Sequence, residues 1–204
     1  MQFTIISGSH REASQSSKVS KYIKTAALQN KLCDKAEILD LANNPLPLWD
    51  QGVWDGDDKW TKLLAPIRTQ CQNSDAFVIV TPEWHGQVPA GLKNLFLLLS
   101  KNEVGHKPAL LVSVSSADGG SFPIAELRMS SYKNNRICYI PEQVIVRNVE
   151  KVLNEKAEDN NATADAYFRD RIQWSLGILK AYATGLKQVR ESGATQTKVY
   201  NNGM

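Results

Sequence analysis

The chain has little cysteine and little histidine, which excludes several kinds of site. Its 204 residues include three of each. The cysteines are Cys33, Cys71 and Cys138, and the histidines are His10, His85 and His106. An odd number of widely spaced cysteines fits neither a disulfide framework nor a zinc knuckle, and the histidines are too far apart for a His-x-x-x-His metal pair. We therefore expect reduced thiols that mostly pack in the interior, and no metal site.

The chain also lacks a block of one charge and a long hydrophobic run. Its net charge is +3 and its basic residues are scattered, so nucleic acid is not an expected partner. The longest apolar stretch, 88–99, is interrupted by Lys93 and Asn94 and falls short of the roughly 20 residues that span a membrane. Residues 1–6 do not resemble a signal peptide. We expect a cytoplasmic protein without a membrane partner.

Two common nucleotide-binding signatures are missing. The chain has no Gly-x-x-x-x-Gly-Lys-Ser/Thr segment, which argues against a nucleoside triphosphatase. It has no Gly-x-Gly-x-x-Gly segment either, which argues against a dinucleotide-binding Rossmann domain. A phosphate ligand, if there is one, fits a mononucleotide better.

What the chain does contain is an ordinary globular composition with a regular alternation of patterns. Hydrophobic residues make up 42% and charged residues 22%. Short β-branched or apolar runs predict strands at 3–6, 36–42, 76–80, 109–114 and 137–146. Helical spacing predicts helices at 16–30, 60–71, 89–100, 122–134 and 163–191, with a loop at 43–59.

Strands that alternate with helices favour an α/β three-layer sandwich, in which helices cover both faces of a five-stranded parallel sheet. We expect one domain over residues 1–191 and a loose C-terminal tail at 192–204. Ligands of such sheets bind beyond the carboxyl ends of the strands. The loops that follow Ile6, Val80 and Val114 are therefore the places to look for a site.

The first of these loops, residues 8–17, has the composition of an anion site. It carries four serines, one glycine and Arg11 directly before a predicted helix, whose first N–H groups are free to bind an anion. The guanidinium can hold two phosphate oxygens, and the helix dipole favours a terminal phosphate. The alternative is that the serines only cap the helix.

The second loop, residues 81–94, contains an aromatic residue, glycine and two prolines before a helix. Its backbone amides could bond the polar edge of a flat ring, with Trp84 and His85 around it and the prolines keeping the loop in place. The alternative is a turn that simply begins a helix at Pro89.

Together the two loops resemble those of the NAD(P)H-dependent FMN reductases, a family that includes related quinone, azo-dye and chromate reductases. The family's Gly-Ser-x-Arg-x-x-Ser segment is matched by Gly8, Ser9, Arg11 and Ser14, with Ser16 two positions later. Its Pro-Glu-Tyr-Asn-Gly-x-x-Pro-x-x-Leu-Lys-Asn segment is matched by Pro82, Glu83, Gly86, Pro89, Leu92, Lys93 and Asn94. The resemblance covers most of the chain, including the segment 46–50.

The resemblance implies a flavodoxin-like fold and one bound FMN. It places the FMN phosphate at Ser9, Arg11, Ser14, Ser16 and Ser17. It places the flavin ring beside Pro82, Glu83, Trp84, His85 and Gly86. Trp84 stands where the family usually has Tyr, and His85 where it usually has Asn. Trp keeps the aromatic face without the hydroxyl, so FMN binding should survive while substrate preference differs.

The third loop, residues 115–121, stands where the family closes over the flavin from the other side. Ser115 is our candidate contact. The family's arginine after the paired glycines is missing, and Asp118-Gly119-Gly120 fits a tight turn as well as a flavin contact. Farther back, the segment with Trp49, Trp54 and Trp60 is interpreted as an interface or a lid; its aspartates lack the spacing of a calcium loop.

The function that follows from the resemblance is an FMN-dependent oxidoreductase. NADPH or NADH would reduce the flavin and leave, and a quinone, a free flavin or a similar small acceptor would then take the electrons, with no side chain acting as acid or base. The resemblance also implies a homodimer or homotetramer. The alternatives are a flavodoxin-type electron carrier that works with a separate reductase, and a non-catalytic scaffold.

Overall fold

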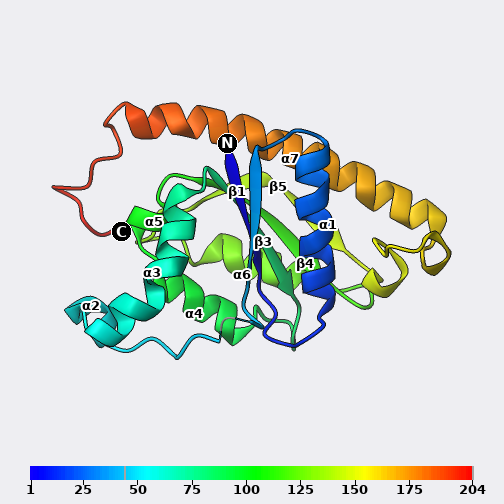
Figure 1. Cartoon of the computed structure of the whole chain (residues 1–204), viewed down its shortest axis with the longest axis horizontal. Helices are drawn as coiled ribbons and strands as arrows, with labels where there is room; N and C mark the ends of the chain where they lie inside the picture. The colour runs from blue at the N-terminus through cyan, green and yellow to red at the C-terminus, as the bar shows by residue number, and fades with distance from the viewer. Residues whose placement is uncertain (44, 204) are drawn as a thin grey trace.

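The computed structural model describes residues 1–43 and 45–203, and in them five parallel strands form one sheet in the order β2-β1-β3-β4-β5 (Figure 1). The strands are β1 (Gln2–Ser7), β2 (Lys35–Asp40), β3 (Ala76–Pro82), β4 (Pro108–Val114) and β5 (Cys138–Val146). Asn44 of the predicted loop and Met204 of the predicted tail lie outside the described residues.

The burial of each strand agrees with its place in the sheet. Every residue of β4 is buried, and β3 is buried as far as Thr81, as expected of strands covered on both faces. β5 lies at an edge, its pairing with β4 shifts register between Ala109 and Leu111, and it carries an exposed Pro141. An edge strand tolerates a proline that a central strand would not.

Helices cover both faces of the sheet. On one face lie α1 (Gln15–Gln29) and α7 (Ala162–Glu191), whose apolar residues share one core cluster with the sheet. On the other lie α3 (Asp58–Asn73), α4 (Ala90–Leu98) and α6 (Ser121–Met129), which share a second cluster. Two one-turn helices, α2 (Gly52–Asp55) and α5 (Lys101–Val104), and 3-10 turns at Val149–Lys151 and Ala157–Asp159 complete the chain. The predicted α/β sandwich is thereby confirmed.

Three local predictions differ from the structure. The predicted loop at 43–59 contains α2, and α5 was not predicted, because four residues show no helical period. The helix predicted to run to residue 134 ends at Met129. There Ser130 Oγ donates to Glu126 O and Ser131 Oγ to Leu127 O, so side chains take carbonyls that a continuing helix would use.

The long α7 crosses the whole molecule, and the segment after it lies at the amino end of the sheet (Figure 1). Arg136 Nη2 donates to Tyr200 O at 2.8 Å, Lys101 Nζ to Asn201 Oδ1 at 3.2 Å, and Gly203 N to Asn134 Oδ1 at 3.1 Å. None of the helices in the described residues combines the length and apolarity that a membrane crossing requires.

Candidate functional site

The loop between β1 and α1 passes so close to β3 that it requires glycine. Gly8 N donates to Val80 O at 2.8 Å. A Cβ at this position would lie 2.9 Å from the same oxygen and 2.7 Å from Leu92 Cδ2. The glycine therefore brings the first loop into contact with the strand from which the second loop leaves.

The start of α1 has the features of a phosphate cradle. Ser14 is the N-cap, and its hydroxyl accepts from Ser17 N at 3.1 Å. No acidic residue of α1 itself stands in its first turn, where the positive end of the helix dipole favours an anion. Ser9 is buried, and its hydroxyl accepts from Arg11 N at 3.2 Å, which folds the loop around the helix end.

Two groups at this helix end lack partners among the described residues. Ser16 Oγ is buried without a hydrogen bond, and the exposed Arg11 guanidinium makes none either. Buried hydroxyls in folded proteins nearly always have a partner, so the residues present fit a bound phosphate monoester. Ser17 differs from the other serines, because its hydroxyl donates to Asp40 Oδ2 at 3.1 Å.

The second loop is a tight hairpin. Trp84 N donates to Gln87 O and Gln87 N to Trp84 O, at 3.1 and 2.9 Å. The two residues between them, His85 and Gly86, have φ values of +52° and +70°. This is the two-residue turn in which both positions are left-handed and Asn-Gly is favoured. Histidine is also enriched at left-handed positions, which explains how it can stand where the family has asparagine.

A ring contact of His10 links the first loop to the second. The His10 ring meets Trp84 edge-on, with 4.8 Å between ring centroids. It also lies against α4, because a Cβ at Gly91 would be 2.9 Å from His10 Cδ2. The contact places Trp84 beside the loop that carries the phosphate cradle.

Glu83 joins the second loop to the third. Its carboxylate accepts a short hydrogen bond from Gly120 N, and a Cβ at Gly119 would lie 3.2 Å from Glu83 Oε1. Gly120 has φ +102°, and a Cβ there would be 2.5 Å from Ile145 Cγ2. Close packing and a left-handed backbone therefore require glycine at Gly120, whereas Gly119 is only closely packed. Ser115 Oγ accepts from Ala117 N at 3.3 Å, within the same turn.

Sequence reasoning missed an arginine beside these glycines. The exposed Arg147, directly after β5, donates through Nε to Gly119 O at 3.1 Å. No local signal points to it, since Arg147 is 28 residues away in the chain. The order of the strands is what brings the end of β5 next to the loop after β4.

The last residues of the second motif hold neighbouring segments. Asn94 accepts from Trp49 N and donates to Pro47 O, both at 2.8 Å, and so fixes the stretch before α2 against α4. Lys93 Nζ lies 3.1 Å from Glu126 Oε1 on α6. Glu126 Oε2 also accepts from Val88 N at 2.7 Å. Sequence reasoning did not single out Glu126.

The contacts through Gly8, His10 and Glu83 thus hold all three predicted loops together at the carboxyl ends of the strands, which lie at the bottom of Figure 1. The largest pKa shifts lie at the opposite end. Burial lowers the pKa of Lys107 to about 8 and raises the pKa of Cys71 and of Tyr139 to about 12. In residues 1–43 and 45–203, no three His, Cys, Asp or Glu side chains gather as metal ligands would.

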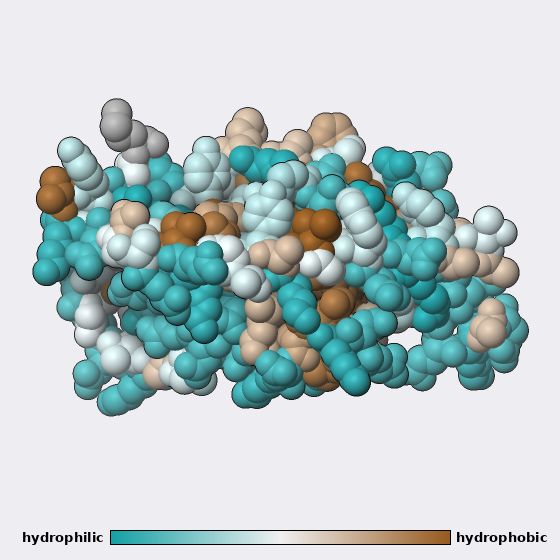
Figure 2. All heavy atoms as spheres, turned by 90° about the horizontal axis from the view of Figure 1, so that it is seen from above, coloured by the Kyte–Doolittle hydropathy of each residue, from teal (hydrophilic) through white to brown (hydrophobic). Residues whose placement is uncertain are grey.

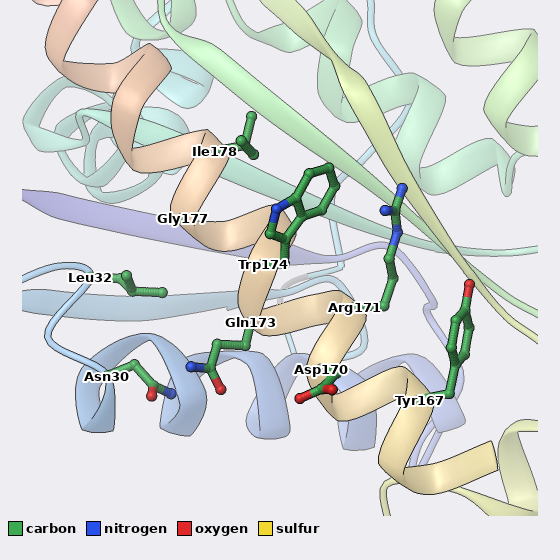
Figure 3. A pocket seen from close by; sticks show the side chains of 9 residues that line it. All are labelled: Asn30, Leu32, Tyr167, Asp170, Arg171, Gln173, Trp174, Gly177 and Ile178. Carbon is green, nitrogen blue, oxygen red and sulfur yellow. The ribbon is translucent and has the colours of Figure 1, made fainter. Parts of the chain in front are cut away.

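A separate groove of about 780 Å³ runs along the outer side of α7 (Figure 3). Seven of its lining residues come from α7, and Asn30 and Leu32 come from the turn that follows α1. Its Arg171 is already paired with Glu142 and stacked on Trp174. The face that contains α7 is mainly hydrophilic with scattered apolar residues (Figure 2). The groove lies away from the three loops.

Comparison with known proteins agrees with the geometry. Residues 1–151 match the model of the NADPH-dependent FMN reductase family. An NADPH azoreductase of Bacillus sp. (strain OY1-2) is 28% identical over 193 residues, which is 94% of this chain and 97% of that protein. An FMN-dependent NADPH-azoreductase of Staphylococcus saprophyticus is 28% identical over 130 residues, 63% of this chain and 68% of that one.

Solved structures with lower identity show the same fold. The flavoenzyme NAD(P)H:(acceptor) oxidoreductase of Paracoccus denitrificans superposes with a TM-score of 0.67 at 19% identity, over 92% of this chain and 97% of that one. An archaeal flavodoxin gives 0.55 at 7% identity, over 90% and 99%. The predicted flavodoxin-like fold is confirmed.

Proposed function

The chain belongs to the NADPH-dependent FMN reductase family, and from this premise we propose that its FMN-dependent oxidoreductase activity serves a small, flat electron acceptor such as a quinone, a free flavin or an azo compound. The relatives that are named azoreductases support an acceptor of this type. NADPH is the expected hydride donor, and NADH an alternative.

The observation that carries the proposal is the pair of partnerless groups at the start of α1. Arg11 and the buried Ser16 hydroxyl would hold the FMN phosphate, together with Ser9, Ser14 and the first N–H groups of the helix. Ser17 lies at the same helix end and orients Asp40. These residues anchor the cofactor and take no part in electron transfer.

The residues of the other two loops would orient the ring. FMN supplies the hydride and electron chemistry when it is bound. The rigid hairpin at Trp84, His85 and Gly86 presents backbone groups beside Pro82, and Ser115 stands at the start of the facing loop. Glu83 would face the ring through its backbone, whereas its carboxylate accepts from Gly120 N. No side chain here is assigned a role as acid or base.

Flavin content and steady-state kinetics test this function. The purified protein should carry FMN or take it up, and should oxidise NADPH with a quinone or free flavin, with the parallel-line kinetics of a two-step exchange. The combined change Arg11→Ala and Ser16→Ala should weaken FMN binding about 100-fold or more, since charged hydrogen bonds contribute about 1.5–3 kcal/mol each.

Ser20→Ala is a matched control. Ser20 is one turn further along α1 than Ser16 and is equally buried, and its hydroxyl also lacks a partner among the described residues, but it is farther from the helix end. It should leave FMN affinity unchanged. Equal losses in both variants would contradict the phosphate site, and NADPH oxidation that needs a separate reductase would favour an electron carrier.

We also propose that the protein works in the cytoplasm as a homodimer or homotetramer. Exposed apolar side chains around α2 and α4 support self-association: Leu48 is 76% exposed, Trp54 78% and Leu97 64%. A mass measurement in solution should give two or four times the chain mass. A monomer at micromolar concentration would contradict this part of the proposal.

A further inference from the structure

We propose that Glu83 and Glu126, here called the glutamate pair, are positioning residues that hold the second loop against the third loop and α6, and so fix the wall along which the electron acceptor enters. The inference rests on the proposed function, because it assigns a role within that site. Neither carboxylate is proposed to touch the flavin or the acceptor.

The two hydrogen bonds of the pair are reciprocal. Glu83 stands on the second loop and accepts from Gly120 N, the residue that caps α6. Glu126 stands on α6 and accepts from Val88 N, at the end of the second loop, at 2.7 Å. Each carboxylate thus satisfies a backbone N–H of the segment that carries the other, and charged acceptors form the stronger class of such bonds.

The glycines of the third loop show how closely the segments approach. Gly119 has Glu83 Oε1 3.2 Å and Ser115 Oγ 3.3 Å from the place of a Cβ. On the other side of the turn, a Cβ placed on Gly120 would lie only 2.5 Å from Ile145 Cγ2. The turn is therefore enclosed between Glu83 and β5, and removing the carboxylate would free one of its two sides.

The pair also sets the position of an exposed aromatic ring. Phe122 follows Gly120 by two residues, is 64% exposed, and lies 3.8 Å from the place of a Cβ on Gly86, at the tip of the hairpin. An aromatic face at the mouth of the site suits a flat acceptor, because ring stacking adds about 0.5–1.5 kcal/mol beyond burial. Phe122 would thus be the surface that the glutamate pair positions.

This arrangement separates the acceptor wall from the cofactor anchor. The phosphate cradle is on α1, whereas the glutamate pair links the second loop with α6. Weakening the pair should therefore raise the KM for flat acceptors far more than it lowers kcat or FMN content. A change in KM at constant kcat is the signature of lost binding that is uniform along the reaction.

The experiment uses the full-length FMN-loaded protein with a quinone and with ferricyanide, a small acceptor that has no ring. Glu83→Ala should raise the quinone KM about tenfold, the equivalent of one lost charged hydrogen bond, and raise the ferricyanide KM much less. Glu83→Gln should restore most of the loss, because its amide oxygen still accepts from Gly120 N. The double variant Glu83→Ala with Glu126→Ala should show a smaller loss of quinone binding free energy than the sum of the losses in the two single variants.

Phe122→Ala should reproduce the quinone effect and leaves both carboxylates in place. Because Phe122 is mostly exposed, its truncation should change the free energy of unfolding by less than about 0.5 kcal/mol. Glu142→Ala is the matched control: Glu142 pairs with Arg171 and is 27% exposed, the same as Glu126, but it lies in the middle of β5. It should leave both KM values unchanged.

The outcomes separate the two proposals. If the unaltered protein holds FMN and reduces quinone, but Glu83→Ala and Phe122→Ala match Glu142→Ala, the role of the glutamate pair is overturned and the proposed function stands. Equal increases for quinone and ferricyanide would also overturn it. If the unaltered protein neither binds FMN nor oxidises NADPH, both proposals fall.

Discussion

Single residues in the three loops are chosen largely by backbone geometry. Gly8 permits a close approach to β3, Gly120 permits one to β5, and His85 with Gly86 completes a turn that needs two left-handed residues. A left-handed backbone of the kind found at His85 and Gly86 costs an ordinary side chain about 1–2 kcal/mol. The local chemistry of the site therefore depends on residues whose side chains do not have to contact a ligand.

A substitution series at His85 tests this geometry. His85→Asn should leave the free energy of unfolding unchanged or slightly higher, because asparagine is favoured in this turn. His85→Val should lower it by about 1–2 kcal/mol, because a β-branched residue fits the left-handed region poorly. Urea unfolding measures both, with the exposure of His85 keeping lost packing small. Equal stability of the two variants would contradict the assigned turn.

At the scale of an element, the last turn of α3 is capped by the buried ammonium group of Lys107. Lys107 precedes β4, and its Nζ donates to Cys71 O and Gln72 O, each at 2.8 Å, at the last turn of the helix. A cation at this end suits the helix dipole. Burial nevertheless dominates, and it lowers the pKa of Lys107 from 10.5 to about 8.

This shift predicts a pH dependence of stability. Between pH 8 and 10.5 the unfolded chain keeps the Lys107 proton that the folded chain has lost, so this group makes the protein more stable as pH rises through that window. Lys107→Met should be less stable throughout, because two carbonyls lose their donor. The stability gap between the original protein and Lys107→Met should widen from pH 7.5 to pH 10.

Urea unfolding at the two pH values measures the gap. Cys71 and Tyr139, whose pKa values burial raises to about 12, act in the opposite direction in both proteins. Comparing the two proteins at each pH therefore removes most of their contribution. A gap that stays constant or narrows would show that the Lys107 ammonium is not desolvated.

The elements also show what the sequence can and cannot predict. Long periodic segments such as β3, β4 and α7 are predictable, because burial on two faces or along one helical stripe imposes the pattern. The one-turn α2 and α5 have no period, and the end of α6 depends on two serine side chains. The bond between Glu83 and Gly120 joins residues 37 apart, so only the folded loops reveal it.

At the scale of the whole molecule, the proposed cofactor should stabilise the fold as well as enable the reaction. A ligand that binds only the native state at about 100 times its Kd adds about 2.7 kcal/mol. For a chain of this length that corresponds to a rise in Tm of roughly 5–11 °C. Riboflavin, which lacks the phosphate, should give a much smaller rise at the same concentration.

Thermal unfolding of the FMN-free protein with each compound measures the difference. The combined Arg11→Ala and Ser16→Ala variant should lose most of the advantage of FMN over riboflavin, because both groups are assigned to the phosphate. Equal shifts for the two compounds in the unaltered protein would contradict a phosphate anchor on α1.

One further contact spans most of the chain. The Lys18 ammonium on α1 is held by Val149 O, Val152 O and Asn154 Oδ1 at 2.6, 2.9 and 2.8 Å, across separations of 131 to 136 residues. During synthesis on the ribosome, the first helix is made early, but these oxygens leave the exit tunnel only when the last strand is complete. The contacts of α1 with β1, β2 and β3 can form earlier, but the Lys18 ammonium gains these three acceptors only after residue 154 has been made.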